Sequence, residues 1–164
     1  MQLFILDREC AASAMFLADV HIIKMCLETA QILSGVIYRQ CEVSLPSEFP
    51  RPYAINHPVL KAIQTPAQVN WIVKYNMELQ KEFIFRFSKN HAYAPLAPRY
   101  TELLYVPEIH ESCENLARTF RNFQSNHLDI VEAHREYYRY KLDLFKRAVR
   151  WTKRPIPVWL ATII

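Results

Sequence analysis

The chain has a single glycine among its 164 residues, far below the usual share. Glycine is the residue that most readily takes positive φ, so tight hairpins and glycine-rich phosphate loops are disfavoured. The ten prolines are clustered rather than scattered. This composition favours helices joined by proline-containing connections.

The four cysteines form neither a Cys-x-x-Cys pair nor a Cys/His metal-ligand spacing. The N-terminus lacks the basic and apolar regions of a signal peptide, and no run approaches the ~18 apolar residues of a membrane span. We therefore expect a cytoplasmic protein with reduced thiols, encoded by a cell or by a virus within it. We expect no metal, no other cofactor and no membrane contact.

Positive charge exceeds negative charge only slightly, because the net charge is +4 and the pI about 8.9. Such a balance permits a nucleic-acid partner without requiring one. The excess gathers in residues 135–154, where eight basic residues face two acidic ones. The C-terminal third is therefore predicted to be the electropositive part.

The pattern of residues predicts an all-α fold, a compact single-domain helical bundle over 1–164. Three long helices and some short ones are expected, with a short extended N-terminal segment or strand at 2–6. Residues 41–58 contain four prolines and predict a structured loop. The expected long helices are 11–38, 66–87 and 128–150, and the short ones 99–105 and 108–122.

The start of the second long helix has the clearest local signal. Thr65 is suited to the N-cap, Pro66 to the first helical position, and Gln68 to the closing of a capping box.

A polar stripe marks the first long helix. At about 100° per residue, four side chains fall within an arc of about 80° while apolar residues occupy nearly everything else. A surface helix normally shows the reverse, so this helix is predicted to be mostly buried with its stripe open to a groove. The stripe consists of His21, Lys24, Glu28 and Gln31.

Ionisable neighbours one turn apart can shift one another's pKa, which favours a functional site. The alternative is a plain surface ion pair between Lys24 and Glu28 beside an ordinary histidine.

Further candidates lie in the proline-rich loop and on the other long helices. In each case a structural role is the alternative: a turn cap, a solvated ion pair or interhelical packing. The basic and aromatic residues of the last helix suit stacking on bases and contact with phosphates. The candidate binding residues are Gln31, Arg51, Tyr53, Asn56, His57, Glu82, Arg86, Lys89, His91, Arg135, Tyr138 and Lys141.

The segment LADVHIIKMCLETAQIL, at 17–33, resembles the first helix of the phage-type pyrimidine-dimer DNA glycosylases. In that family Leu-Ala-Asp-x-His is followed seven residues later by the catalytic glutamate, whose position Glu28 occupies here. Residues 56–87 are similar to the Asn-His-Pro segment and Glu/Arg helix of bacterial members. The resemblance covers about half of the chain and extends to small phage proteins with a similar helix.

The resemblance implies an amine nucleophile that attacks the deoxyribose C1′ through a Schiff base, with a glutamate moving protons. In the family that amine is the α-amine of the processed N-terminus. Here Gln2 is bulky, so Met1 is expected to remain and to supply the free amine. Lys24 is a substitute amine one turn from Glu28. The predicted catalytic residues are therefore Glu28, Lys24, His21 and Met1.

The first functional hypothesis is a DNA repair glycosylase with AP-lyase activity on damaged double-stranded DNA. The alternative is a non-catalytic protein that binds a nucleotide or a nucleotide-derived signal. A third hypothesis, a helical protein-interaction module, explains the apolar content but gives the stripe no purpose.

Overall fold

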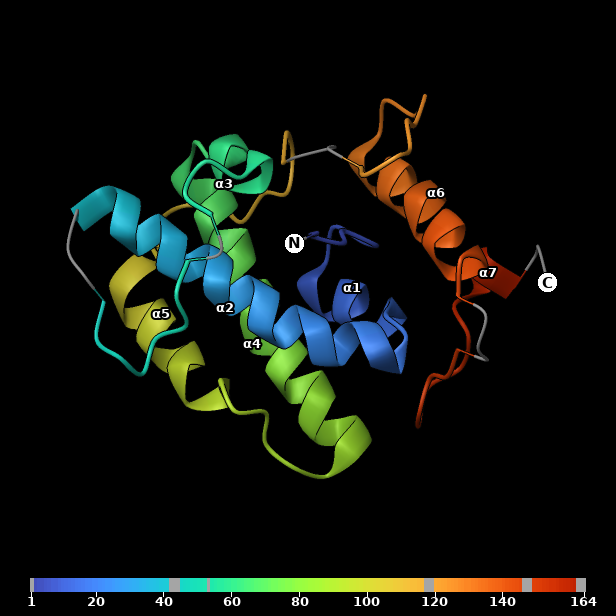
Figure 1. Ribbon diagram of the computed structural model, residues 1–164, viewed down its shortest axis with the longest axis horizontal. Helices are drawn as coiled ribbons and strands as arrows, with labels where there is room; N and C mark the ends of the chain where they lie inside the picture. Colours follow the sequence, from blue (N-terminus) through green and yellow to red (C-terminus); the bar gives the residue numbers. More distant parts are fainter. Residues whose placement is uncertain (1, 42–44, 53, 117–119, 146–148, 162–164) are drawn as a thin grey trace.

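The computed structural model describes residues 2–41, 45–52, 54–116, 120–145 and 149–161. These residues form helices and contain no strand, which confirms the predicted all-α class (Figure 1). In chain order the elements are α1 Cys10–Phe16, α2 Asp19–Cys41, α3 Pro58–Ala62, α4 Pro66–Phe87, η1 Ala94–Leu96, α5 Ala97–Leu104, α6 Ile130–Asp143 and α7 Val158–Ala161.

The core forms where α2 crosses α4, with α5 at one end of the molecule and α6 and α7 at the other (Figure 1). Polar contacts fix this crossing. Asn76 Nδ2 on α4 donates to Thr29 Oγ1 on α2 at 2.7 Å. Tyr100 Oη on α5 donates to the carbonyl of Ala30 at 3.0 Å. The stripe-bearing helix is thus held from two sides by buried residues.

The predicted start of the second long helix is confirmed. The Gln68 N–H donates to Thr65 Oγ1 at 3.3 Å, and the Thr65 N–H donates to Gln68 Oε1 at 3.1 Å. Pro66 is the first helical residue, and α4 ends at Phe87, before Ser88 at a φ of 54°. The capping box therefore fixes the residue at which α4 begins.

The single helix predicted for 11–38 is wrong, because the chain breaks at Leu17 and Ala18 into α1 and α2. Tertiary contacts stabilise the break. The Ala18 N–H donates to Tyr138 Oη at 2.8 Å, and the Leu17 carbonyl accepts from Arg86 Nη1 at 2.7 Å. Backbone groups that lose their helical partners at the break are thus hydrogen-bonded by side chains of α6 and α4.

The N-terminal segment packs against the helices without forming a strand, so it is the extended segment rather than the strand that the sequence left open. Leu3 to Leu6 are at most 3% exposed. Tyr75 Oη donates to the Phe4 carbonyl at 2.9 Å, and Arg135 Nε donates to the Leu6 carbonyl at 2.8 Å. Side chains of α4 and α6 therefore provide the partners that a neighbouring strand would otherwise supply.

The short helix predicted for 99–105 exists as α5, whereas the one predicted for 108–122 is absent from the described part of that range. Asn115 and Asn122 take φ values of 60° and 56°, which a helix does not tolerate. The Asn70 side chain also accepts the Val106 N–H at 2.9 Å and donates to the Ile109 carbonyl at 2.9 Å.

The long helix predicted for 128–150 is too long, because α6 ends at Asp143. It begins at Ile130, two residues after the predicted start, where Asp129 accepts the N–H groups of Val131 and Glu132 as the N-cap. An acidic residue in the last turn opposes the helix dipole. Beyond it, the Asp19 N–H donates to the Arg150 carbonyl at 2.9 Å, so this part of the chain binds the start of α2.

By length and composition alone α2 could cross a membrane, although no membrane-spanning segment was expected from the sequence. However, 72% of its most apolar window is buried inside the protein. The central helix of a folded domain has the same composition, so this finding is weak evidence for a membrane.

A buried ion network joins the start of α2 to α4 and to the C-terminal segment. Arg86, 2% exposed, donates to Glu82 Oε1 at 2.6 Å and to Asp19 Oδ1 at 3.0 Å. Its Nη2 donates to the Met15 carbonyl at 2.8 Å. Arg154 Nη2 donates to Glu82 Oε2 at 2.7 Å. All three nitrogens of the Arg86 guanidinium are therefore used to join three parts of the chain.

We predict that Arg86→Met lowers the free energy of unfolding by about 3 kcal/mol or more, because it leaves buried carboxylate and carbonyl groups without their donor. Urea denaturation at pH 7 measures the change. Lys81→Met on the exposed side of α4 is the matched control and should change stability by no more than about 0.5 kcal/mol. Equal effects of the two substitutions would contradict the structural role of Arg86.

Candidate functional site

The Glu28 carboxylate lies between the interior and solvent, on the side of α2 that faces the N-terminal segment. The residue is 7% exposed. Its Oε2 accepts the Gln2 N–H at 3.1 Å, and its Oε1 lies 3.4 Å from Lys24 Nζ. Lys24 is exposed over 57% of its side chain. The carboxylate therefore contacts both the backbone near the start of the chain and an amine open to solvent.

His21, two turns before Glu28, is buried and oriented by Tyr138. Its Nδ1 lies 2.8 Å from Tyr138 Oη. That hydroxyl oxygen already accepts the Ala18 N–H, so its own hydrogen can be donated to His21 Nδ1. If His21 Nδ1 accepts the Tyr138 hydrogen, the proton of the neutral imidazole lies on Nε2. Burial lowers the pKa of His21 to about 4, and the positive charges of Lys24 and Lys141 act in the same direction.

Phe4 forms an aromatic wall beside this pair. Its ring centroid lies 5.2 Å from that of His21 and 4.9 Å from that of Tyr138. Lys141 follows Tyr138 on α6, and its charge acts on His21. Two lysines from different helices therefore act on one neutral imidazole.

His57 connects the proline-rich segment to the same region. It is the N-cap of α3, a short helix that begins where the predicted loop ends, and its Nδ1 accepts the Val59 N–H at 3.2 Å. Burial lowers the pKa of His57, while the negative charge of Glu28 raises it. The Asn-His-Pro segment therefore lies near enough for the charge of Glu28 to act on His57, a relation that no sequence spacing could give.

The stripe itself is only partly as expected. His21 and Glu28 are buried, Lys24 is exposed and Gln31 is half-buried. Ile23, expected on the buried side, is 49% exposed. The accessible side of α2 therefore carries apolar as well as ionisable side chains.

The remaining candidates are spread over the molecule. Glu82 and Arg86 lie in the buried ion network, and Arg135 binds the N-terminal segment through the Leu6 carbonyl and Asp7. His91 is half-buried beside the rings of Phe83 and Tyr93. Roles in substrate binding stay predictions for all of them. Arg51, Asn56 and Lys89 are exposed, and Met1 and Tyr53 lie outside the described residues.

Much of the predicted electropositive region 135–154 is used inside the protein. Arg135 pairs with Glu132 at 2.9 Å, and Arg139 Nη2 donates to the Trp159 carbonyl at 2.9 Å. Arg154 joins the network at Glu82. A count of basic residues therefore overstates the charge that this part of the chain offers to a partner.

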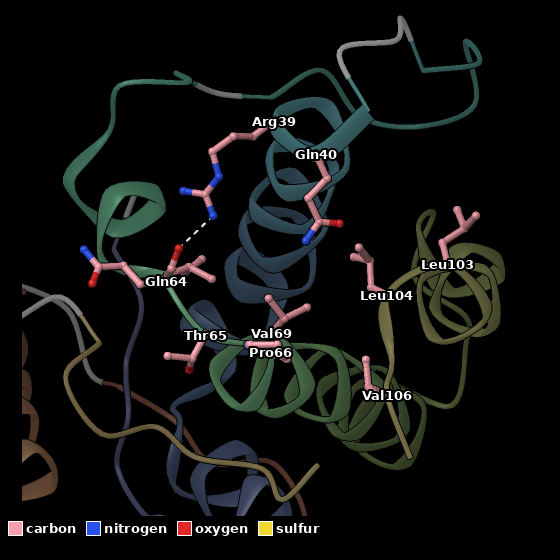
Figure 2. A pocket seen from close by; sticks show the side chains of 10 residues that line it. Arg39, Gln40, Gln64, Thr65, Pro66, Val69, Leu103, Leu104 and Val106 are labelled. Atoms are coloured by element: carbon pink, nitrogen blue, oxygen red, sulfur yellow. Dashed lines mark hydrogen bonds between the residues drawn. The ribbon is translucent and has the colours of Figure 1, made fainter. Parts of the chain in front are cut away.

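A cavity of about 380 Å³ lies elsewhere, between the end of α2, the α3–α4 junction and the end of α5 (Figure 2). Arg39 donates to the carbonyls of Leu60 at 2.8 Å and Ile63 at 2.7 Å, which satisfies the end of α3. None of the stripe residues lines this cavity. This cavity is therefore separate from the region around Glu28.

Sequence reasoning missed Gln2 and Phe4 as parts of the site. Gln2 acts through its backbone N–H, which any residue except proline would provide. Phe4 stood in an apolar run with no distinguishing neighbour. No pattern in the sequence could have selected either residue.

Comparison with known proteins identifies a family to which the chain is similar. The sequence model of the family described as pyrimidine dimer DNA glycosylase matches residues 1–95, more than half of the chain. No curated protein and no solved structure matches. The matched region includes α1 to α4, and therefore Gln2, Lys24, Glu28 and His57.

The buried, neutral state of His21 predicts a pH dependence of stability. Its folded-state pKa of about 4 is below the ordinary value of 6.5, so protons bind preferentially to the unfolded chain between these values. Lowering the pH from about 6.5 to 4 should therefore cost about 3 kcal/mol of unfolding free energy. Denaturation of wild type and His21→Asn measures this, because the variant lacks the contribution. Parallel pH curves for the two proteins would refute it.

Proposed function

Because this chain belongs to the pyrimidine dimer DNA glycosylase family, we propose that it removes a damaged pyrimidine from double-stranded DNA and then cleaves the abasic site. The observation that carries the proposal is the position of Glu28. This carboxylate lies within the matched region and contacts both the Gln2 N–H and Lys24 Nζ. A carboxylate beside a candidate amine is the pair that Schiff-base chemistry requires.

In the proposed reaction a neutral amine bonds to the deoxyribose C1′ while the C1′–base bond breaks. The base leaves with the bonding electrons and takes up a proton. Opening of the sugar ring and loss of the amine protons give the Schiff base. Glu28 then helps to move the C2′ proton, and the 3′ phosphate departs with the electron pair. Each step needs a base within hydrogen-bond reach of the amine and sugar.

We propose the α-amine of the mature N-terminus as the nucleophile, with Lys24 as the competing candidate. An α-amine has an ordinary pKa of about 7.7–8.0, so a useful fraction is neutral near pH 7. Lys24 is instead exposed over 57% of its side chain, and its Nζ lies 3.4 Å from Glu28 Oε1 in an ion pair. The contact of Gln2 N with Glu28 also supports this choice.

The substrate is held, in this proposal, by the cations around His21. Lys24 and Lys141 offer charges to phosphate oxygens, and neutral His21 lies buried beside them. Because many other basic residues are engaged internally, we expect few phosphate contacts and a shallow salt dependence of DNA binding.

The test is borohydride trapping on a duplex that contains one abasic site. Wild type and Lys24→Ala should both give a covalent protein–DNA adduct. Glu28→Gln should lower the rate of strand cleavage at least about 100-fold, the usual size of a general acid–base contribution. Glu78→Gln on α4 is the matched control and should cleave at the wild-type rate.

Absence of an adduct with wild-type protein would overturn the Schiff-base proposal. If such protein instead released a nucleotide on denaturation, the non-catalytic binding alternative would be favoured. Loss of the adduct in Lys24→Ala alone would make Lys24 the nucleophile.

A further inference from the structure

The aromatic contacts of His21 extend from the interior to the surface. The His21 ring centroid lies 5.2 Å from that of Phe4 and 5.4 Å from that of Phe145, whose ring stands at 85° to the imidazole. Phe4 is 3% exposed and belongs to the core, whereas Phe145 is 39% exposed. Rings at such distances and angles attract each other edge to face. His21 therefore fixes a phenyl ring that is still open to solvent.

Phe145 lies just beyond the end of α6, where the chain is held in place. Its N–H donates to the Leu142 carbonyl at 2.9 Å, which fixes the backbone at this point. Among the described residues, the Phe145 ring has no aromatic neighbour other than His21. Leu144, the preceding residue, is 56% exposed. The end of α6 thus presents apolar and aromatic surface to solvent.

Positive charge surrounds the same imidazole. The charges of Lys24 and Lys141 both act on His21, and Lys141 precedes Phe145 by four residues. Asp143, the acidic residue in the last turn of α6, points about 160° away from Lys141 at about 100° per residue. An exposed ring next to cations is the combination that binds unpaired nucleotides, because the base stacks on the ring while the phosphates meet the charges. A purely apolar partner would leave the two lysines without a role.

The Phe145 ring lies close enough to Glu28 to contact the same DNA. His21 and Glu28 are seven residues apart on α2, or about 10 Å along the helix axis. The N-terminal segment runs beside this stretch, because Gln2 contacts Glu28 and Phe4 contacts His21. Successive bases of a DNA strand are about 3.4 Å apart. A base against Phe145 is therefore only a few base steps from a sugar at Glu28.

We propose that Phe145 stacks on an unpaired base of the bound DNA, a few base steps from the sugar that is attacked. This inference rests on the proposed glycosylase function and adds a residue that recognises the lesion rather than one that takes part in catalysis. In an intact duplex both faces of each base are covered by neighbouring bases. A damaged or abasic site loses part of this stacking, so the unstacking of a base there requires less free energy. Phe145 therefore favours binding at damaged sites over binding to intact duplex.

The test is binding to a duplex that contains one tetrahydrofuran abasic analogue, which cannot form a Schiff base, and to the same duplex without it. Phe145→Ala should weaken binding to the analogue duplex about 10-fold, the usual size of one base–aromatic stack, and change binding to the intact duplex by less than about twofold. Phe145→Trp should bind the analogue duplex at least as tightly as wild type. Phe85→Ala is the matched control, because Phe85 is 44% exposed but its ring is covered by the Arg154 guanidinium at 4.3 Å. It should bind both duplexes like wild type.

Phe145→Leu separates stacking from packing, because leucine keeps apolar cover over His21 and has no π-face. We expect it to lose affinity for the analogue duplex as Phe145→Ala does. Wild-type affinity of either variant for the analogue duplex, an equal loss on both duplexes, or no preference of wild type for the analogue would overturn the proposal. Borohydride trapping of wild type on abasic DNA is independent of these results, so failure of the stacking proposal and failure of the glycosylase proposal can be told apart.

Discussion

The structure depends on one buried guanidinium. Arg86 is inaccessible to solvent, yet it joins Glu82 on its own helix, Asp19 at the start of α2 and the carbonyls that end α1. These contacts fix the place where the first long helical stretch breaks. The break in turn sets the orientation of α2, and with it the direction in which Glu28 points. The Arg86 ion network thus sets the position of Glu28, the proposed catalytic residue.

Burial divides the stripe into parts with different properties. His21 is enclosed, paired with Tyr138 and held neutral, whereas Lys24, one turn later, stays in solvent. Glu28 lies between these extremes and contacts the backbone of the second residue. A neutral donor, a cation and a carboxylate therefore occupy adjacent turns of one helix. This arrangement suits a reaction in which a proton moves while a phosphate backbone is held nearby.

The parts of the fold that local chemistry controls were predictable. The capping box at Thr65 follows from residue types at fixed spacing, and the stripe follows from helical periodicity. The break at Leu17 could not be predicted, because it is stabilised by side chains from distant helices. For the same reason the sequence could not distinguish a structural Arg86 from a substrate-binding one. The proximity of His57 to Glu28 is likewise a tertiary property.

We propose that Glu28 moves protons for a reaction in which the N-terminal α-amine is the nucleophile. The most direct test of this proposal is mass-spectrometric mapping of the protein residue bound to abasic DNA after borohydride reduction. We expect the adduct on the peptide that contains the mature N-terminus, and we expect its loss when that amine is blocked by acetylation. An adduct found only on the peptide that contains Lys24, or on a lysine remote from Glu28, would contradict it.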